Sequence, residues 1–216
     1  MPDLLKILIK MDWTSLYLKT TDLNVFILGT GEVATRRANK FLTHGANVKL
    51  AGNHLTDELE CKGAVLCSTD DVDELVKWAD LVVVASGDEE LSEYVCGIAQ
   101  DKLVNRADFP QKGDIIVPTS FNIGEIEISI FTNGKSPLMA RQLRKKIQSI
   151  ITEEDILEIE LQDYARNKLK EIVEDQKDRR NFLYEIFEDD NVNNFIKKGD
   201  IGGAKNYIDN LIRGLM

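Results

Sequence analysis

The sequence predicts an α/β fold whose first part, residues 1–113, is a doubly wound parallel sheet. A small α+β region over residues 114–150 and a helical C-terminal domain over residues 151–216 follow it. In the first part, short apolar runs of strand length alternate with segments of helical periodicity, and no hairpin signal interrupts them. β-rich segments then appear, and beyond Ile150 the apolar residues recur only at helical spacing.

The stretch from Asn24 to Leu42 organises the first domain. Its apolar run, Val25 to Leu28, is typical of a strand buried on both faces of a parallel sheet. Gly29 then permits a tight turn, Gly31 allows the backbone to approach a pyrophosphate, and Ala34 allows the following helix to pack closely. Strand, glycine turn and helix together predict a dinucleotide-binding domain of the Rossmann type, with a tight connection that binds no ligand as the alternative.

The identity of the dinucleotide stays open on physical grounds. The acid expected about 20 residues after the glycines is missing, and the second strand, Asn47–Ala51, is followed by Gly52, Asn53 and His54. Asn53 can hydrogen-bond a ribose, but no carboxylate nearby repels a 2′-phosphate, so both NAD and NADP are compatible with these residues.

Ligands of doubly wound sheets bind at the carboxyl ends of the strands. Besides the glycine turn and the Gly52–His54 segment, this rule selects Ser86–Asp88 and Asn105–Asp108. Ser86 is a candidate cofactor contact, and Asp108 lies where a reacting group is expected. A turn aspartate before Pro110 is the alternative interpretation of Asp108.

Composition excludes several classes of protein. A net charge of −10 argues against general nucleic-acid binding. No apolar run approaches the length of a membrane span, and the stretch from Met1 to Lys10 is too short and too charged for a secretory signal. We expect a cytoplasmic protein, with Met11 as an alternative start. The cysteines and histidines of the chain do not have the spacing of a zinc site: Cys61, Cys67, Cys96, His44 and His54. We therefore expect the three cysteines to be reduced thiols.

The central region combines two β-rich segments with a helix. Ile115–Pro118 and Ile126–Phe131 are predicted to be extended, and the second alternates as a half-buried antiparallel strand does. After a turn, Ser136 is the expected N-cap and Pro137 the first residue of a helix. A region this small cannot bury itself, so we expect it to form the interface of a homodimer.

A local reversal of charge marks the same region. Residues 132–150 carry five cations and no acid, in a chain of net charge −10. A solvated helix face is one interpretation. An anion site formed by the N-terminal end of the Ser136 helix with Lys135 and Arg141 is the other.

With these motifs in place, the chain resembles the precorrin-2 dehydrogenase family, which includes the dehydrogenase/ferrochelatase part of siroheme synthases. The sequence Gly29-Thr-Gly-Glu-Val-Ala-Thr-Arg-Arg corresponds to that family's Gly-Gly-Gly-x-Val-Ala-x-Arg-Lys. The stretch from Gly134 to Arg141 matches the family's most specific motif, Gly-Lys-Ser-Pro-x-x-Ala-Arg. The resemblance extends from about Leu16 into the C-terminal helices.

The resemblance implies NAD-dependent oxidation of precorrin-2, a tetrapyrrole, to sirohydrochlorin, and in bifunctional members Fe²⁺ insertion to give siroheme. It implies an NAD-binding domain, a dimerisation region and a helical domain. The family's aspartate, in Asn-Val-Val-Asp, falls on Asp108, which we hypothesise to be the general base. The resemblance implies NAD contacts at Glu32, Val33, Asn53 and His54, and it places the motif serine at Ser136. Together with the residues selected above, the candidate cofactor contacts are Gly29, Gly31, Glu32, Val33, Asn53, His54 and Ser86, and the candidate substrate contacts are Asn105, Lys135, Ser136 and Arg141.

Two departures from the family pattern bear on the chemistry. Arg106 and Ala107 replace a more apolar pair, and the region after Pro110 lacks the usual Cys-Asp-Phe. No histidine follows His54, so a metallation site would use carboxylates. Chelatase activity and its metal-binding residues therefore stay open.

Two other functions are compatible with a dinucleotide-binding domain. One is an NAD-dependent dehydrogenase of a small hydroxy acid, which would normally use a histidine or lysine with an arginine near the strand ends. The other is a non-enzymatic module that reports bound NAD to a partner. Such a sensor would not need the anion-binding element at Lys135–Arg141.

Overall fold

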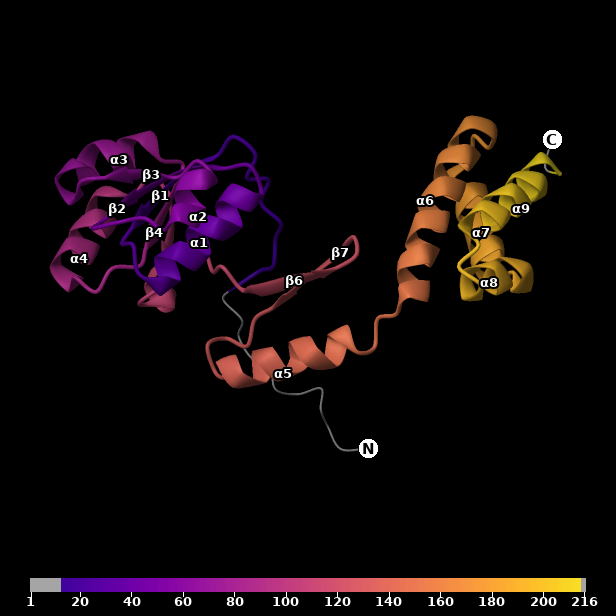
Figure 1. Cartoon of the computed structure of the whole chain (residues 1–216). Helices are drawn as coiled ribbons and strands as arrows, with labels where there is room; N and C mark the ends of the chain where they lie inside the picture. The colour runs from indigo at the N-terminus through magenta and orange to yellow at the C-terminus, as the bar shows by residue number, and fades with distance from the viewer. Residues whose placement is uncertain (1–12, 215–216) are drawn as a thin grey trace. The chain divides into compact units, whose positions relative to one another are not determined.

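The computed structural model describes residues 13–214 (Figure 1). The alternative start at Met11 therefore lies outside the described residues. The chain divides after Val117 into two compact units, which are described separately below. No helix within residues 13–214 has the length and apolar character that crossing a membrane requires.

The first unit is built on a five-stranded parallel sheet in the order β3-β2-β1-β4-β5. β1 lies at the centre, and the chain moves outward from it first on one side and then on the other. The predicted doubly wound sheet is thus confirmed. The strands are β1 Asn24–Leu28, β2 Asn47–Ala51, β3 Val65–Cys67, β4 Leu81–Val84 and β5 Leu103–Arg106.

Helices cover both faces of this sheet (Figure 1). Val25 and Ile27 of β1 pack with α1 and α2 on one face, whereas Phe26 and Leu28 pack with α3 and α4 on the other. Both faces of β1 are therefore buried, which explains its unbroken apolar run. The helices are α1 Glu32–Thr43, α2 Asp57–Cys61, α3 Val72–Trp78 and α4 Glu89–Ile98, with 3₁₀ turns η1 Thr69–Asp71 and η2 Pro110–Lys112.

One prediction for the segment after β5 is wrong. Ile115–Pro118 forms no strand, and the hairpin consists of β6 Thr119–Ile123 and β7 Ile126–Ile130. The backbone N–H groups of Asp114 and Ile115 both donate to the carbonyl oxygen of Val104. The side chains of Ile115 and Val117 cover the sheet face on which α1 packs. The apolar residues of this segment therefore serve as cover for the first unit.

The second unit begins with the β6–β7 hairpin and continues with helix α5, Pro137–Gln148. Ser136 is the N-cap of α5, because its hydroxyl accepts a hydrogen bond from Met139 N, and Pro137 is the first helical residue, as predicted. The predicted turn before it is present, with positive φ at Asn133 and Gly134.

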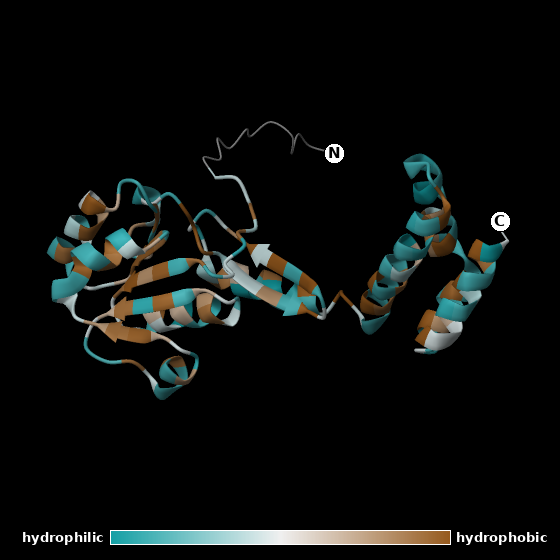
Figure 2. Cartoon of the chain, turned by 90° about the horizontal axis from the view of Figure 1, so that it is seen from above, coloured by the Kyte–Doolittle hydropathy of each residue, from teal (hydrophilic) through white to brown (hydrophobic). Residues whose placement is uncertain are grey.

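The C-terminal helices form a bundle with a separate apolar core. They are α6 Glu153–Ile172, α7 Gln176–Glu188, α8 Asp190–Lys197 and α9 Ile201–Arg213. Hydrophobic residues recur at intervals along these helices, with hydrophilic residues between them (Figure 2). Leu161, Leu169 and Ile208 are fully buried in the core. Asp200 caps α9 by accepting from Gly203 N, which confirms the predicted helix start.

Candidate functional site

The turn after β1 requires glycine at its first position. Gly29 has a φ of 109°, and a Cβ added there would lie 2.5 Å from the carbonyl oxygen of Ala85, just after β4. Only glycine combines this backbone conformation with so close an approach. The predicted tight turn is therefore present at the centre of the sheet, where the two halves of the fold meet.

Gly31 occupies a different environment. It is the N-cap of α1, makes no side-chain capping hydrogen bond, and has no atom within 4 Å of the position that a Cβ would take. No side chain of Gly31 caps the first turn of α1, and the positive end of this twelve-residue helix lies at the same point. Such a cradle fits the pyrophosphate of a dinucleotide. Ala34 is fully buried against the sheet, as the motif predicts.

Thr30 joins the loop after β1 to the loop after β2. Its Oγ1 accepts a hydrogen bond from Asn53 N at 3.3 Å. A Cβ on Gly52 would lie 2.6 Å from its methyl carbon, so Gly52 lets the two loops pack together. Thr30 lies within the predicted glycine turn but is not among the individual residues predicted to contact the cofactor. Its position between the two motif glycines, facing the end of the neighbouring strand, is the signal that could have identified it.

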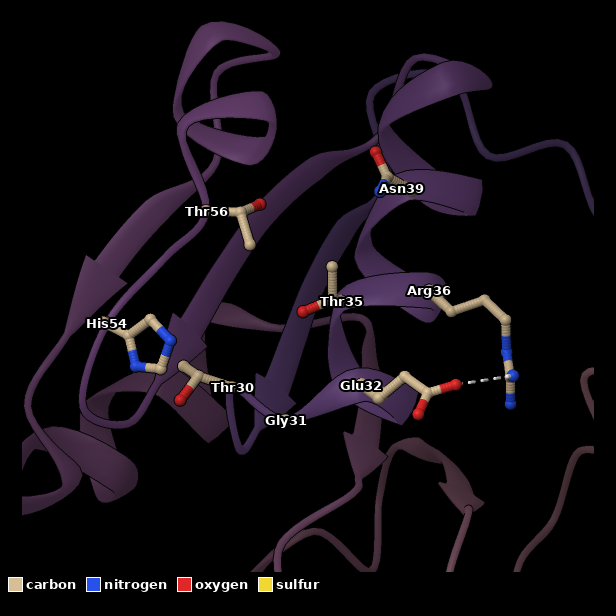
Figure 3. Close-up of a pocket in the computed structure, with 8 residues that line it drawn as sticks. All are labelled: Thr30, Gly31, Glu32, Thr35, Arg36, Asn39, His54 and Thr56. Carbon is tan, nitrogen blue, oxygen red and sulfur yellow. Dashed lines mark ion pairs between the residues drawn. The ribbon is translucent and has the colours of Figure 1, made fainter.

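A hollow of about 570 Å³ lies beside this turn (Figure 3). It brings together three of the predicted cofactor contacts, Gly31, Glu32 and His54. Glu32 and Arg36 form an exposed ion pair at 3.9 Å along α1, and His54 comes from the opposite loop (Figure 3). The remaining lining residues are not among the predicted cofactor contacts: Thr30, Thr35, Arg36, Asn39 and Thr56.

The other predicted cofactor residues do not line the hollow. Ser86 follows β4, its backbone nitrogen lies 3.2 Å from the Cβ position of Gly29, and its Oγ accepts a hydrogen bond from Asp88 N. Val33 is exposed on α1, and Asn53 is held through its backbone by Thr30. Their contacts with a cofactor stay predictions.

Asp108 forms a bidentate ion pair with Arg106. Arg106 Nε donates to one carboxylate oxygen at 2.9 Å, and Nη2 donates to the other at 2.6 Å. The Arg106 side chain is 2% exposed and that of Asp108 is 29% exposed. Asp108 is therefore not the isolated acid that its sequence position suggests. Arg106, two residues earlier in the chain, is its partner.

The ion pair changes the acidity of Asp108. The Arg106 guanidinium hydrogen-bonds the carboxylate and holds the pKa of Asp108 below its usual value, although partial burial acts in the opposite direction. The same hydrogen bonds raise the pKa of Arg106 against the effect of its burial. Both groups are therefore charged at neutral pH.

Asn105 holds β5 to the segment that follows it. Its side chain is buried, and its Nδ2 donates to the carbonyl oxygen of Ile115 at 3.0 Å. Among the residues that the structure describes, its Oδ1 has no hydrogen-bond partner. A contact between Asn105 and a substrate stays a prediction.

The predicted anion-binding residues lie in the second unit, around the start of α5. Lys135 and Arg141 are exposed, and neither forms an ion pair with any residue of the described chain. The hydroxyl of Ser136 is engaged as the N-cap. Arg144 lies over the ring of Phe121 at 5.1 Å. The exposed cations are thus available to an external anion.

Residues 13–214 contain no cluster of three or more histidine, cysteine, aspartate or glutamate side chains placed to hold a metal ion. The expected chelatase activity stays a prediction.

Comparisons with known proteins agree with this geometry. Residues 16–119 match a family model described as NAD(P)-binding. The chain is 29% identical to a precorrin-2 dehydrogenase of Methanosarcina barkeri over 78% of its own length and 80% of that protein. It is 30% identical to a siroheme synthase of Hydrogenovibrio crunogenus over 80% of its own length, but over 38% of that longer protein.

A solved structure shares the fold. SirC, a precorrin-2 dehydrogenase, superposes with a TM-score of 0.72 at 23% identity, over 92% of this chain and 100% of that one. The match supports the arrangement of an α/β domain followed by helices. The chain is thus a homologue of the precorrin-2 dehydrogenases and siroheme synthases, and its first unit is an NAD(P)-binding domain.

Proposed function

We propose that this protein is an NAD-dependent precorrin-2 dehydrogenase, which oxidises precorrin-2 to sirohydrochlorin in siroheme biosynthesis. The carrying observation is the open cradle over Gly31, in a chain that aligns with most of a precorrin-2 dehydrogenase. The geometry supports the dinucleotide, and the likeness to the dehydrogenase identifies the substrate.

In this proposal the first unit holds the cofactor. The N–H groups at the start of α1 bind the pyrophosphate above Gly31, while the loop carrying Asn53 and His54 flanks the adenosine ribose. Bound NAD accepts a hydride from the substrate. Gly29 keeps the turn close to the end of β4, so the cradle lies at the carboxyl edge of the sheet, where such folds bind ligands.

Asp108 is proposed as the carboxylate that acts on the substrate. It follows β5, which pairs in parallel with β4, so it lies at the same edge of the sheet as the glycine turn. Oxidation of the macrocycle removes one hydride and one proton. A fixed negative charge beside the reacting ring stabilises the electron-poor species that forms when the hydride leaves.

The exposed cations of the second unit are proposed to bind the substrate's acidic side chains. Precorrin-2 carries many carboxylates, and Lys135 and Arg141 are cations with no acidic partner in the described chain. Positive charge gathered on one surface of an acidic protein attracts such a substrate and excludes neutral ones.

A homodimer is proposed for the same region. Leu138 and Met139 at the start of α5 are 66% and 50% exposed, and Ile150 just beyond the helix is also exposed. Adjacent exposed apolar side chains of this size are characteristic of an interaction surface. A second copy of the chain would remove them from water.

The decisive experiment mixes the purified protein with precorrin-2 and NAD and follows the absorbance of NADH and of the oxidised macrocycle. The proposal predicts that both signals rise together in a one-to-one ratio. NAD binding without turnover would favour a sensor, and NAD reduction by hydroxy acids alone would favour the other dehydrogenase class. Addition of Fe²⁺ or Co²⁺ to the finished reaction then tests for chelation.

A further inference from the structure

A buried arginine at the carboxyl end of β5, in the first unit, donates hydrogen bonds to three other residues. Besides its two bonds to Asp108, Arg106 donates through Nη1 to Glu93 Oε1 at 3.1 Å and to Cys96 Sγ at 3.3 Å. Burying a guanidinium is costly unless its donors are satisfied. The arrangement of these partners suggests a purpose beyond packing, because the most closely bound of them is the candidate catalytic carboxylate.

We infer that Arg106 is a positioning residue, which fixes the orientation of Asp108 and keeps it as a permanent anion. The inference rests on the proposed function, in which Asp108 acts on the substrate. It revises the hypothesis that Asp108 takes up the proton as a general base. Asp108 becomes instead a constant negative charge and hydrogen-bond acceptor for the substrate.

The orientation follows from the geometry of the pair. Arg106 is the last residue of β5 and Asp108 lies two residues further on, in the bend that follows the strand, where its carboxylate meets the Arg106 guanidinium. The two parallel N–H···O bonds engage both carboxylate oxygens, so the plane of the carboxylate cannot rotate freely. A lysine would supply only a point charge at this position.

The neighbouring charged groups keep the pair from being disturbed. Glu93 on α4 binds the far side of the guanidinium, and Lys112 in η2 donates to the same Glu93 oxygen at 3.1 Å. The thiol of Cys96 completes the surroundings, and burial raises its pKa, so that it stays neutral. Arg106 and Lys112 thus balance the charges of Asp108 and Glu93. No excess negative charge is left that would favour protonation of Asp108.

The consequence concerns the proton balance of the reaction. A carboxylate whose conjugate acid is unusually strong is a weak proton acceptor. The substrate transfers a hydride to NAD and releases a proton to water. Asp108 therefore carries the same negative charge before and after the reaction. The rate should therefore be insensitive to Asp108 titration across the physiological pH range.

The first test needs neither substrate nor cofactor. The carboxyl carbon of Asp108 is titrated by ¹³C NMR in the full-length protein, with Asp108→Asn used to assign its signal. In the unsubstituted protein the midpoint should lie below the usual value of about 3.9. In Arg106→Leu it should rise by about one pH unit or more, and in Arg106→Lys by less.

Lys112→Met is the matched control. It removes one positive charge from the same network but no bond to Asp108, so the midpoint should move by only a few tenths of a pH unit. An Asp108 midpoint at the usual value in the unsubstituted protein overturns the inference. So does a midpoint that is the same in both Arg106 variants as in the unsubstituted protein, and if Arg106→Leu does not fold, Arg106→Lys alone decides.

The second test is the pH profile of kcat/KM for precorrin-2 oxidation. The unsubstituted protein should show no inflection from Asp108 between pH 5 and 8. Arg106→Leu should lose about tenfold in rate for each pH unit below its raised Asp108 pKa. An equal loss at all pH values would mean that Arg106 only supports the fold, and would overturn the inference. If the unsubstituted protein does not oxidise precorrin-2, the proposed function fails, while the NMR titration still tests Arg106.

Discussion

Gly29 and Ala85 approach each other where β1 and β4 end, so closely that a Cβ on Gly29 would lie 2.5 Å from the Ala85 carbonyl oxygen. Two residues later, Gly31 has open space around the corresponding position. The two motif glycines are therefore needed for different reasons. Gly29 is required by the fold, and Gly31 is suited to an approaching ligand.

This difference predicts that Gly29→Ala destabilises the first unit. The alanine would be held at positive φ and pressed against backbone that cannot move away. We expect a loss of about 2–4 kcal/mol in the free energy of unfolding. Urea titration followed by tryptophan fluorescence measures it, because Trp13 and Trp78 both precede Val117. Unchanged stability would contradict the close approach.

Gly31→Ala is the matched variant, and its predicted effect is on binding. Its φ of −76° suits alanine and its Cβ meets no atom within 4 Å, so stability should change by less than about 1 kcal/mol. The methyl group should instead obstruct the pyrophosphate and weaken NAD binding at least about tenfold. Isothermal titration calorimetry measures the dissociation constant of NAD. Equal affinity in the unsubstituted protein and in Gly31→Ala would show that the pyrophosphate does not bind at Gly31.

Asn53→Asp should make the protein discriminate between the two pyridine dinucleotides. A carboxylate after β2 can accept hydrogen bonds from the ribose hydroxyls of NAD, but it repels the 2′-phosphate of NADP. We expect NAD affinity to be retained and NADP affinity to fall about tenfold or more relative to it. Asn53→Ala serves as the control and should leave the ratio of the two affinities unchanged. Competitive binding of both dinucleotides measures that ratio.

The Arg106–Asp108 pair should make stability depend on pH in the acid range. The folded-state pKa of Asp108 is lowered, so its contribution is complete above the unfolded value of about 3.9 and is lost as the pH falls through the folded value. Asp108→Asn should cost about 1–3 kcal/mol of unfolding free energy between pH 5 and 8. The difference between the two proteins should shrink below about pH 4. A difference that grows on acidification would have the wrong sign for this pair.

Arg141→Gln should weaken substrate binding without changing the affinity for NAD. The side chain is exposed and has no acidic partner in the part of the chain that the structure describes. We expect KM for precorrin-2 to rise roughly five- to tenfold, and the difference to diminish as salt is added. Lys146→Gln removes the same charge from the last turn of α5 and is the control. Equal effects of the two substitutions would indicate general attraction and no specific contact.

Leu138→Glu should convert a dimer into monomers. Leu138 is a large apolar side chain exposed at the start of α5, and a buried carboxylate at an interface is strongly unfavourable. Sedimentation velocity should show about half the mass of the unsubstituted protein. Leu16→Glu changes another exposed leucine outside this region and should leave the mass unchanged. A monomeric unsubstituted protein would refute the homodimer directly.

Local chemistry was enough to predict much of this protein from its sequence. The unbroken apolar run of β1 indicates burial on both faces, and the Gly29–Ala34 motif indicates a tight turn into a helix. Ser136 and Asp200 identify helix starts because a capping side chain bonds to backbone only two or three residues away. Each of these features depends on residues close together in the chain.

The tertiary structure decided which distant groups meet. The apolar segment Ile115–Val117 has the composition of a strand, but no strand pairs with it, and its side chains cover the first unit. Arg106 and Asp108 are neighbours in sequence, yet the burial of Arg106 and its bonds to α4 follow only from the packing of that helix on the sheet. Composition cannot distinguish a strand from an apolar segment that packs over a sheet, and it cannot distinguish a free carboxylate from an ion-paired one. Both differences depend on the partners that the tertiary structure brings to these residues.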